Sequence, residues 1–271
     1  MGEVTVGDVR VAYDVQGCDD AGAPLLVLIH GTTQDRTGWA TITPALASTH
    51  RIVLPEMPGS GQTVDGGGPL ELDDIVTQIV AVADDALGDA SAPFALGGYS
   101  LGAVVAAATA AKLRDRVTSL TLLCGWATSD AHMRFEFDLW RRLLETDVEL
   151  FLRHALSHGF TSAWYDMVGD EMAATVAQAT VGLVNGPGAA RQAELDTRID
   201  IAGRLDDITA PTRVIGATGD RFVPFRHSEA LANGIRGARL DSVDAGHLCI
   251  LERADDVARL VTDHVAANGA H

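Results

Sequence analysis

The feature of the sequence that most constrains its fold is a series of short apolar runs separated by longer helical stretches. Leu25–Ile29 contains only aliphatic residues, a pattern typical of a strand covered on both faces of a sheet. Further strands are predicted at residues 51–54, 94–96, 120–123, 212–217 and 240–243. Strands that alternate with helices indicate βαβ units and a mostly parallel sheet.

The helical stretches and the N-terminal region complete this prediction. Residues 70–87 have apolar side chains at helical spacing and acidic residues near the start, where they suit a helix N-terminus. Residues 101–113 and 254–268 predict two further helices. Alternating valines within residues 4–15, interrupted by Gly7 and Asp8, predict an antiparallel hairpin. The expected fold is therefore α/β, with an eight-stranded, mostly parallel sheet flanked by helices.

One long region interrupts the alternation. Residues 129–205 contain no convincing strand but are rich in large apolar side chains at helix-like positions. We interpret them as an inserted helical lid, with Gly186-Pro187-Gly188 as a break between two of its helices. The expected domain organisation is a core formed by residues 1–128 and 206–271, with the lid at 129–205.

Charge and composition exclude several kinds of partner. The net charge of −17 argues against binding to nucleic acid or to an anionic membrane surface. No run approaches the roughly 20 apolar residues that span a bilayer, and the first residues lack a secretory pattern. Cys18, Cys124 and Cys249 show no metal-binding or redox spacing. We expect a cytoplasmic protein, a monomer or homodimer, that acts on a small molecule without a metal or cofactor.

The strongest chemical signal is Gly98-Tyr99-Ser100-Leu101-Gly102, which follows a predicted strand and precedes a predicted helix. Glycines permit the sharp turn that such a junction needs, because a side chain there would collide with the backbone. The turn presents the hydroxyl of Ser100 above the edge of the sheet. Ser100 is therefore the candidate nucleophile.

A serine hydroxyl reacts only when a base removes its proton, and the sequence offers both partners. Asp220 follows the penultimate predicted strand and His247 follows the last one. Their order after the serine, and their positions beyond the carboxyl ends of strands, suit a catalytic triad of Ser100, Asp220 and His247. Each has an alternative reading: Asp220 could cap the helix that starts near Phe225, and His247 could be an ordinary polar residue near a strand end.

Two backbone N–H groups are candidates for an oxyanion hole. Leu101 stands at the start of a predicted helix, and Thr32 follows Gly31 in the loop after the buried strand. An ordinary strand-to-helix turn is the alternative for this loop, and His30 is expected to be structural. The predicted substrate-binding residues, which could equally be packing residues, are Thr33, Gln34, Trp39, Trp126, Phe137 and Trp140.

Taken together, these motifs resemble the α/β-hydrolase superfamily over nearly the whole chain. The residues that carry the resemblance are His30-Gly31, Pro58-Gly59-Ser60-Gly61, Gly98 to Gly102, Gly219-Asp220 with Val223-Pro224, and Gly246-His247. Within the superfamily, the chain is similar to lidded esterases, enol-lactonases and carbon–carbon bond hydrolases that use serine. The resemblance implies cleavage of an ester, lactone or related acyl bond of a small, largely apolar molecule through an acyl-enzyme.

The resemblance is not complete, and other functions stay open. Many members read Asp-x-Arg-Gly-His-Gly-x-Ser after the fourth strand, whereas this chain reads Glu-Met-Pro-Gly-Ser-Gly-Gln-Thr at residues 56–63. Ser100 in place of aspartate argues against haloalkane dehalogenases and epoxide hydrolases. The alternatives are acyl transfer or cyclisation without hydrolysis, and a ligand-binding receptor that retains the fold.

Overall fold

The computed structural model describes residues 1–20 and 22–268, and in this part of the chain eight strands form one sheet in the order β1-β2-β4-β3-β5-β6-β7-β8. The β1–β2 and β2–β4 pairs are antiparallel, and all the other pairs are parallel. The predicted α/β architecture is therefore confirmed. The strands are β1 (Gly2–Val6), β2 (Val9–Gly17), β3 (Leu25–Ile29), β4 (Arg51–Pro55), β5 (Phe94–Tyr99), β6 (Val117–Leu123), β7 (Thr212–Ala217) and β8 (Arg239–Val243).

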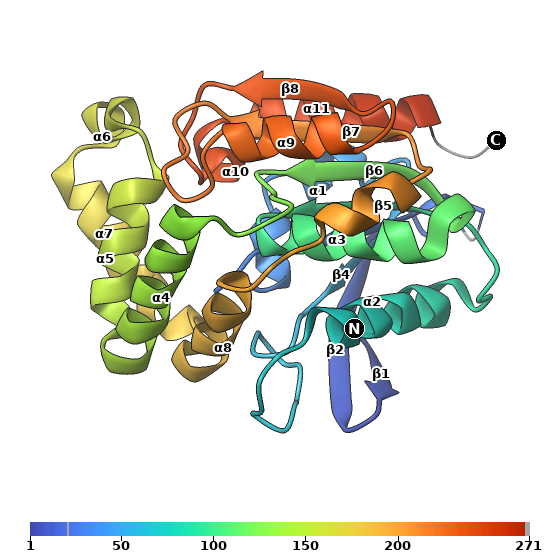
Figure 1. Ribbon diagram of the computed structural model, residues 1–271, viewed down its shortest axis with the longest axis horizontal. Helices are drawn as coiled ribbons and strands as arrows, with labels where there is room; N and C mark the ends of the chain where they lie inside the picture. The colour runs from blue at the N-terminus through green and yellow to red at the C-terminus, as the bar shows by residue number, and fades with distance from the viewer. Residues whose placement is uncertain (21, 269–271) are drawn as a thin grey trace.

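Helices cover both faces of the sheet (Figure 1). One apolar core lies between the sheet and α2 (Leu72–Leu87), α3 (Leu101–Leu113) and α9 (Arg226–Gly234). A second core, on the opposite face, contains residues of α1 (Thr43–Leu46), α10 (Cys249–Glu252) and α11 (Ala254–Asn268). Short 3-10 helices are η1 (Arg36–Trp39), η2 (Arg114–Arg116), η3 (Val181–Leu183) and η4 (Ala202–Asp207). None of the helices in the described part of the chain is both long and apolar enough to cross a bilayer.

Several elements differ in extent from the sequence prediction: β6 begins at Val117 rather than at residue 120, and β5 and α2 also differ. β5 continues beyond residue 96 through Gly97 and Gly98 to Tyr99. Glycine is unfavourable in strands, but here a side chain would not fit, because a Cβ on Gly98 would lie 2.0 Å from the carbonyl oxygen of Gly102. α2 begins at Leu72 rather than residue 70, and Leu70 is nevertheless buried against the core.

Between β6 and β7 the described chain forms only helices and isolated bridges. They are α4 (Ala131–Thr146), α5 (Val148–Gly159), α6 (Ser162–Val168), α7 (Asp170–Thr180), η3 and α8 (Gly186–Asp196), followed by η4. Figure 1 shows α4 to α8 grouped beyond the end of the sheet toward which the arrows of β6 and β8 point. Gly186 and Pro187 form the first turn of α8, so the predicted helix break lies just before them, at the N-cap Asn185.

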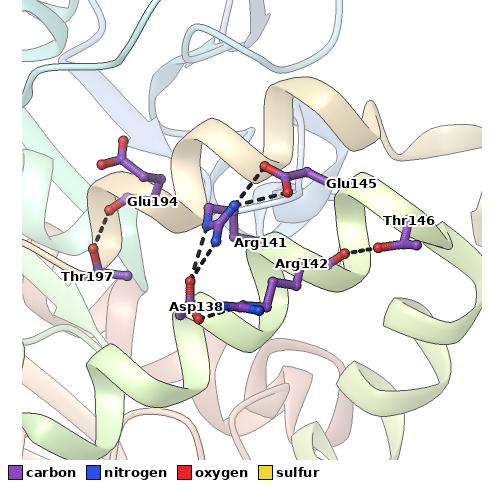
Figure 2. A network of polar contacts seen from close by, with 7 residues as sticks. All are labelled: Asp138, Arg141, Arg142, Glu145, Thr146, Glu194 and Thr197. Carbon is purple, nitrogen blue, oxygen red and sulfur yellow. Dashed lines mark hydrogen bonds and ion pairs between the residues drawn. The ribbon is translucent and has the colours of Figure 1, made fainter.

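α4 has one buried face and one charged face. Its buried residues include Phe137 and Trp140, and it packs against α8. On the outer face, Arg141 pairs with Asp138 at 2.8 Å and with Glu145 at 3.0 Å, as Figure 2 shows. Pairs three and four residues apart contribute about 0.3–0.5 kcal/mol each to a helix. These pairs therefore support the helix locally, whereas the buried face holds it against the rest of the protein.

Candidate active site

Ser100 lies in a sharp turn between β5 and α3. Its φ of 56° and ψ of −121° form a backbone conformation that residues with side chains rarely adopt, at a cost of about 1–3 kcal/mol. The Ser100 N–H donates to the carbonyl oxygen of Leu123 at 2.9 Å, and its own carbonyl accepts from the N–H groups of Ala103 and Val104. The surrounding hydrogen bonds therefore hold the turn in this conformation.

The start of α3 passes so close to β3 that only glycine fits at position 102. A Cβ there would lie 2.1 Å from the carbonyl oxygen of Ile29 and 2.4 Å from that of His30. Both are backbone atoms that cannot rotate away.

We expect Gly102→Ala to lower the free energy of unfolding by about 3 kcal/mol, because α3 must shift away from the sheet. Urea unfolding followed by circular dichroism measures this loss. Gly203→Ala is the matched control, because a Cβ at Gly203 meets nothing within 4 Å. A loss at position 102 no larger than that at position 203 would contradict the steric argument.

The structure brings Ser100, Asp220 and His247 together at the carboxyl ends of β5, β7 and β8. His247 Nε2 lies 3.1 Å from Ser100 Oγ, and His247 Nδ1 lies 2.6 Å from Asp220 Oδ2. All three residues are buried, with exposed fractions of 5%, 7% and 4% for the serine, the aspartate and the histidine. The three side chains form a continuous hydrogen-bonded chain from carboxylate to hydroxyl.

Asp220 is fixed by its own loop and is not a helix cap. Its Oδ1 accepts from the N–H groups of Phe222 and Val223, each at 2.9 Å, which leaves Oδ2 for His247. The N-cap of α9 is Phe225, which forms no side-chain cap bond. Asp220 therefore does not cap the helix that starts near Phe225, which was its alternative role.

The loop that carries His247 is held at several points. The hydroxyl of Tyr99 donates to the carbonyl oxygen of His247 at 2.8 Å. The N–H of Gly219, next to Asp220, donates to the carbonyl oxygen of Ala245 at 2.9 Å. These bonds link the residue before the serine, and the aspartate loop, to the histidine loop.

The loop after β3 closely approaches the turn that carries Ser100. A Cβ on Gly31 would lie 3.1 Å from the Cβ of Ser100. Within residues 1–20 and 22–268, neither the Thr32 N–H nor the Leu101 N–H donates a hydrogen bond. These two backbone N–H groups, one in the loop after β3 and one directly after Ser100, therefore have no partner among the described residues.

His30, next to this loop, has a structural environment. It is fully buried; its Nδ1 contacts the carbonyl oxygen of Gly31 at 2.8 Å, and its Nε2 accepts from the N–H of Met57 at 3.0 Å. Burial lowers the pKa of His30 to about 4. The neutral ring links the ends of β3 and β4 and lies outside the triad.

Three of the predicted substrate-binding residues belong to a row of aromatic rings that reaches the histidine. Trp126 stacks on Phe137 at 5.5 Å, Phe137 meets Trp140 at 5.4 Å, and Trp140 meets Phe222 at 4.7 Å. The ring of Phe222 lies 5.5 Å from that of His247. Phe222, from the loop after β7, thus lies between the aromatic rings of α4 and the triad histidine.

The other three predicted binding residues lie outside this row of rings. Thr33 donates its N–H to Gln192 Oε1 at 3.0 Å, and Gln34 accepts from the N–H of Gly31 at 3.2 Å. Both residues belong to the loop beside the serine. Trp39 is 1% exposed and packs in the core on the α1 and α11 face of the sheet, with no ring contact to the aromatic row among the described residues.

One group of side chains in the described part of the chain has metal-ligand geometry. A sulfur of Cys124, a carboxylate oxygen of Asp220 and a ring nitrogen of His247 lie within 4.8 Å of one another. Cys124 Sγ also lies 3.6 Å from Cys249 Sγ. Because the aspartate and the histidine already bond to each other, an ion at this point would have to separate them.

The sequence reasoning did not identify Phe222, Gln192 or Asp196. Phe222 stands two residues after Asp220, so its place beside the triad could have been inferred from that spacing. Gln192 and Asp196 have no such signal, because polar residues four apart on a helix are typical of a solvated face. In the structure both are 0% exposed and bond to the loop after β3.

Comparisons with known proteins identify the family of the chain. The model of the alpha/beta hydrolase family matches residues 26–260. Pyrrolizixenacetamide deacetylase of Xenorhabdus hominickii is 36% identical over 263 residues, which cover 96% of this chain and 96% of that protein. The enol-lactonase from Burkholderia xenovorans LB400 has a TM-score of 0.86 at 22% identity, covering 98% of this chain and 100% of that chain.

A further solved structure, a thermophilic esterase from Thermogutta terrifontis, has a TM-score of 0.84 at 22% identity and is covered over 100% of both chains. At this identity, the two structural neighbours show the shared fold. The family match and the 36% identical relative extend over nearly the whole sequence. The chain therefore belongs to the alpha/beta hydrolase family.

Proposed function

We propose that the chain is a serine hydrolase that cleaves an ester, lactone or amide bond of a small, largely apolar molecule through an acyl-enzyme. The observation that carries this proposal is the chain of contacts from Asp220 through His247 to Ser100, at 2.6 and 3.1 Å. A base within hydrogen-bond reach of a hydroxyl, itself oriented by a buried carboxylate, is the arrangement that activates serine. The name of the 36% identical relative, a deacetylase, supports acyl-bond chemistry.

Acylation requires four events at this site. Ser100 Oγ attacks the acyl carbon while His247 Nε2 takes the hydroxyl proton. Asp220 stabilises the resulting imidazolium. The carbonyl oxygen becomes an oxyanion that accepts from the N–H groups of Thr32 and Leu101, and each such donor contributes about 3 kcal/mol to the transition state. When the tetrahedral intermediate collapses, His247 returns the proton to the departing alcohol or amine.

Deacylation repeats these steps with water as the nucleophile. His247 takes a proton from water as its oxygen attacks the acyl carbon, and the ester bond to Ser100 breaks. The serine oxygen recovers the proton from the imidazolium, and a carboxylic acid leaves. Ser100 and water each give up one proton in this cycle, His247 carries each of them to the leaving group, and Asp220 and the two backbone N–H groups stabilise the charges that develop.

We assign residues 129–205 the role of a lid that shapes the acyl pocket. The support is the row of rings that includes Phe137 and Trp140 of α4 and ends at Phe222 beside His247. Trp126, Phe137 and Trp140 would set the apolar wall, and Thr33 and Gln34 would line the oxyanion loop. Apolar walls with a few convergent polar groups are typical of small-molecule sites.

The test is covalent labelling of the nucleophile followed by product analysis. A fluorophosphonate should add one phosphonyl group to the protein, and peptide mass spectrometry should find it on Ser100. Incubation with 4-nitrophenyl acetate in the presence of methanol should then release acetic acid as the main product.

Two controls accompany this experiment. Ser91→Ala removes a serine that belongs to an exposed turn and should label like the wild type. Heat-unfolded protein should not label, because the serine then lacks its base. Label on another residue, or methyl acetate as the sole product, would contradict a hydrolase that uses Ser100.

A further inference from the structure

Two buried polar side chains on α8 hold the loop that contains the candidate oxyanion donor. Gln192 Oε1 accepts from the N–H of Thr33 at 3.0 Å, and Asp196 Oδ2 accepts from the hydroxyl of Thr32 at 2.6 Å. Both α8 residues are 0% exposed. They stand four residues apart and therefore share one face of the helix. α8 thus bonds directly to the two loop residues that follow Gly31.

The carboxyl group of Asp196 lacks the partners that an ionised carboxylate needs. Among the described residues, its Oδ1 forms no hydrogen bond, and no cationic side chain pairs with it. A buried ionised carboxylate without a counter-charge is strongly unfavourable, whereas the neutral acid is tolerated.

The charged groups around Asp196 are already paired. His30, on the loop side, is neutral because burial lowers its pKa to about 4, and His247 bonds to Asp220. On α8 and the segment before α4, the ion pairs are Arg191 with Asp65, Arg198 with Glu71, and Asp130 with Arg226, while Arg134 of α4 donates to the carbonyl oxygen of Ser129.

The position of Asp196 is nevertheless well defined. Its carbonyl oxygen accepts from Ser129 Oγ at 2.6 Å, and Ser129 Oγ in turn accepts from the indole N–H of Trp126 at 2.9 Å. Burial raises the pKa of the Asp196 carboxyl to about 8, against the opposing effect of the hydrogen bond from Thr32. At neutral pH the group is therefore mainly the neutral acid.

We propose that Asp196 is a positioning residue for the oxyanion loop and that it serves the reaction as a neutral carboxylic acid. This inference rests on the proposed function, in which the Thr32 N–H stabilises the oxyanion. The side chain fixes the Thr32 hydroxyl, and with Gln192 it sets the direction of the loop. An ionised Asp196 would add a second negative charge beside the developing oxyanion and would oppose the reaction.

The first test compares the pH dependence of kcat in the wild type and in Asp196→Asn, using 4-nitrophenyl acetate with correction for spontaneous hydrolysis. Asparagine has nearly the same shape, can accept from Thr32, and does not ionise. At about pH 9 we expect the wild type to have lost about tenfold in kcat, because about one molecule in eleven keeps the neutral acid. The asparagine variant should match the wild type within about threefold near pH 7 and should not show this alkaline decline.

The second test separates positioning from general packing. Asp196→Ala removes the acceptor of the Thr32 hydroxyl and should lower kcat by about 10- to 100-fold with KM changed by less than about threefold, because oxyanion stabilisation acts mainly in the transition state. Glu194→Gln, on the partly exposed side of α8, is the matched control for losing an acid and should stay within about twofold. Thermal unfolding by circular dichroism confirms that each variant is folded.

Each outcome bears on one of the two proposals. If wild type and Asp196→Asn show the same alkaline decline, or if Asp196→Ala changes kcat no more than Glu194→Gln, the positioning role of Asp196 is wrong while the hydrolase proposal stands. If the wild type neither labels at Ser100 nor hydrolyses the ester, the proposed function fails and the role of Asp196 fails with it.

Discussion

Replacing Ser100 with alanine is expected to lower kcat for a 4-nitrophenyl ester by about a millionfold while leaving the fold intact. The reason is that no acyl-enzyme forms when the hydroxyl is absent, so His247 has no proton to accept from the side chain at position 100. The remaining activity is direct attack of water on the ester, which the backbone N–H donors and the pocket accelerate only weakly. Stopped-flow and long-incubation assays together cover this range of rates.

Stability is the second part of this expectation. Alanine keeps a Cβ, so the unusual φ of 56° at position 100 is retained and the strain is neither added nor released. The free energy of unfolding should therefore change by less than about 0.5 kcal/mol. A variant that loses activity because it unfolds would show a clear loss in urea instead.

A matched control comes from Ser119 on β6. This serine is 1% exposed, and its Oγ has no hydrogen-bond partner in the described part of the chain. Ser119→Ala should keep full activity, so it reports the effect of losing a buried hydroxyl without touching the triad. Activity in Ser100→Ala above about 1% of the wild type would show that another group is the nucleophile.

The scaffold of the site could be predicted because its signals are local in the sequence. The aliphatic run of β3 indicates a strand covered on both faces of the sheet. Gly98 and Gly102, on either side of Ser100, indicate a turn too tight for side chains. Strand ends in a parallel sheet share one edge, so Asp220 and His247 could be expected near the serine. Their distances could not be predicted, because these depend on bonds between loops such as that from Gly219 to Ala245.

The end of β5 shows how tertiary packing overrides a local signal. Two glycines ended the predicted strand at residue 96, since glycine has no side chain to pack in a sheet. In the structure the strand continues to Tyr99: α3 lies directly against Gly98, and the side chain of Leu28 on β3 lies against Gly97. The same close approach that weakens the strand signal creates the turn that presents Ser100.

The residues on α8 could not be identified for a different reason. Gln192 and Asp196 are buried only because α8 packs on the loop after β3, a contact between residues about 160 positions apart in the chain. Trp39 illustrates the converse. Trp39, one of the predicted pocket residues, ends η1 and packs in the core on the face of α11. Long-range packing, rather than residue type, decides these cases.

Replacing Asp220 with asparagine is expected to lower kcat by about 10,000-fold with little change in KM. Asp220 Oδ2 accepts a hydrogen bond from His247 Nδ1 at 2.6 Å, while Oδ1 already accepts hydrogen bonds from two backbone N–H groups. In the variant, the amide oxygen best replaces Oδ1, so the amide NH2 faces the imidazole. Nδ1 must then be unprotonated, which puts the ring proton on Nε2, where it blocks acceptance from Ser100.

This mechanism makes further outcomes measurable. The rate of fluorophosphonate labelling should fall with kcat, because both need an activated hydroxyl, and the signal of the proton on His247 Nδ1 should vanish from the low-field region of the NMR spectrum.

Asp244→Asn is the matched control. Asp244 is an exposed acid near the histidine loop that contacts Thr218, and its replacement should change kcat by less than about twofold. If Asp220→Asn keeps more than about a tenth of the activity, the histidine is oriented by something other than this carboxylate. The bond from the Tyr99 hydroxyl to the carbonyl oxygen of His247 would then be the next contact to remove, because it joins the end of β5 to the histidine residue itself.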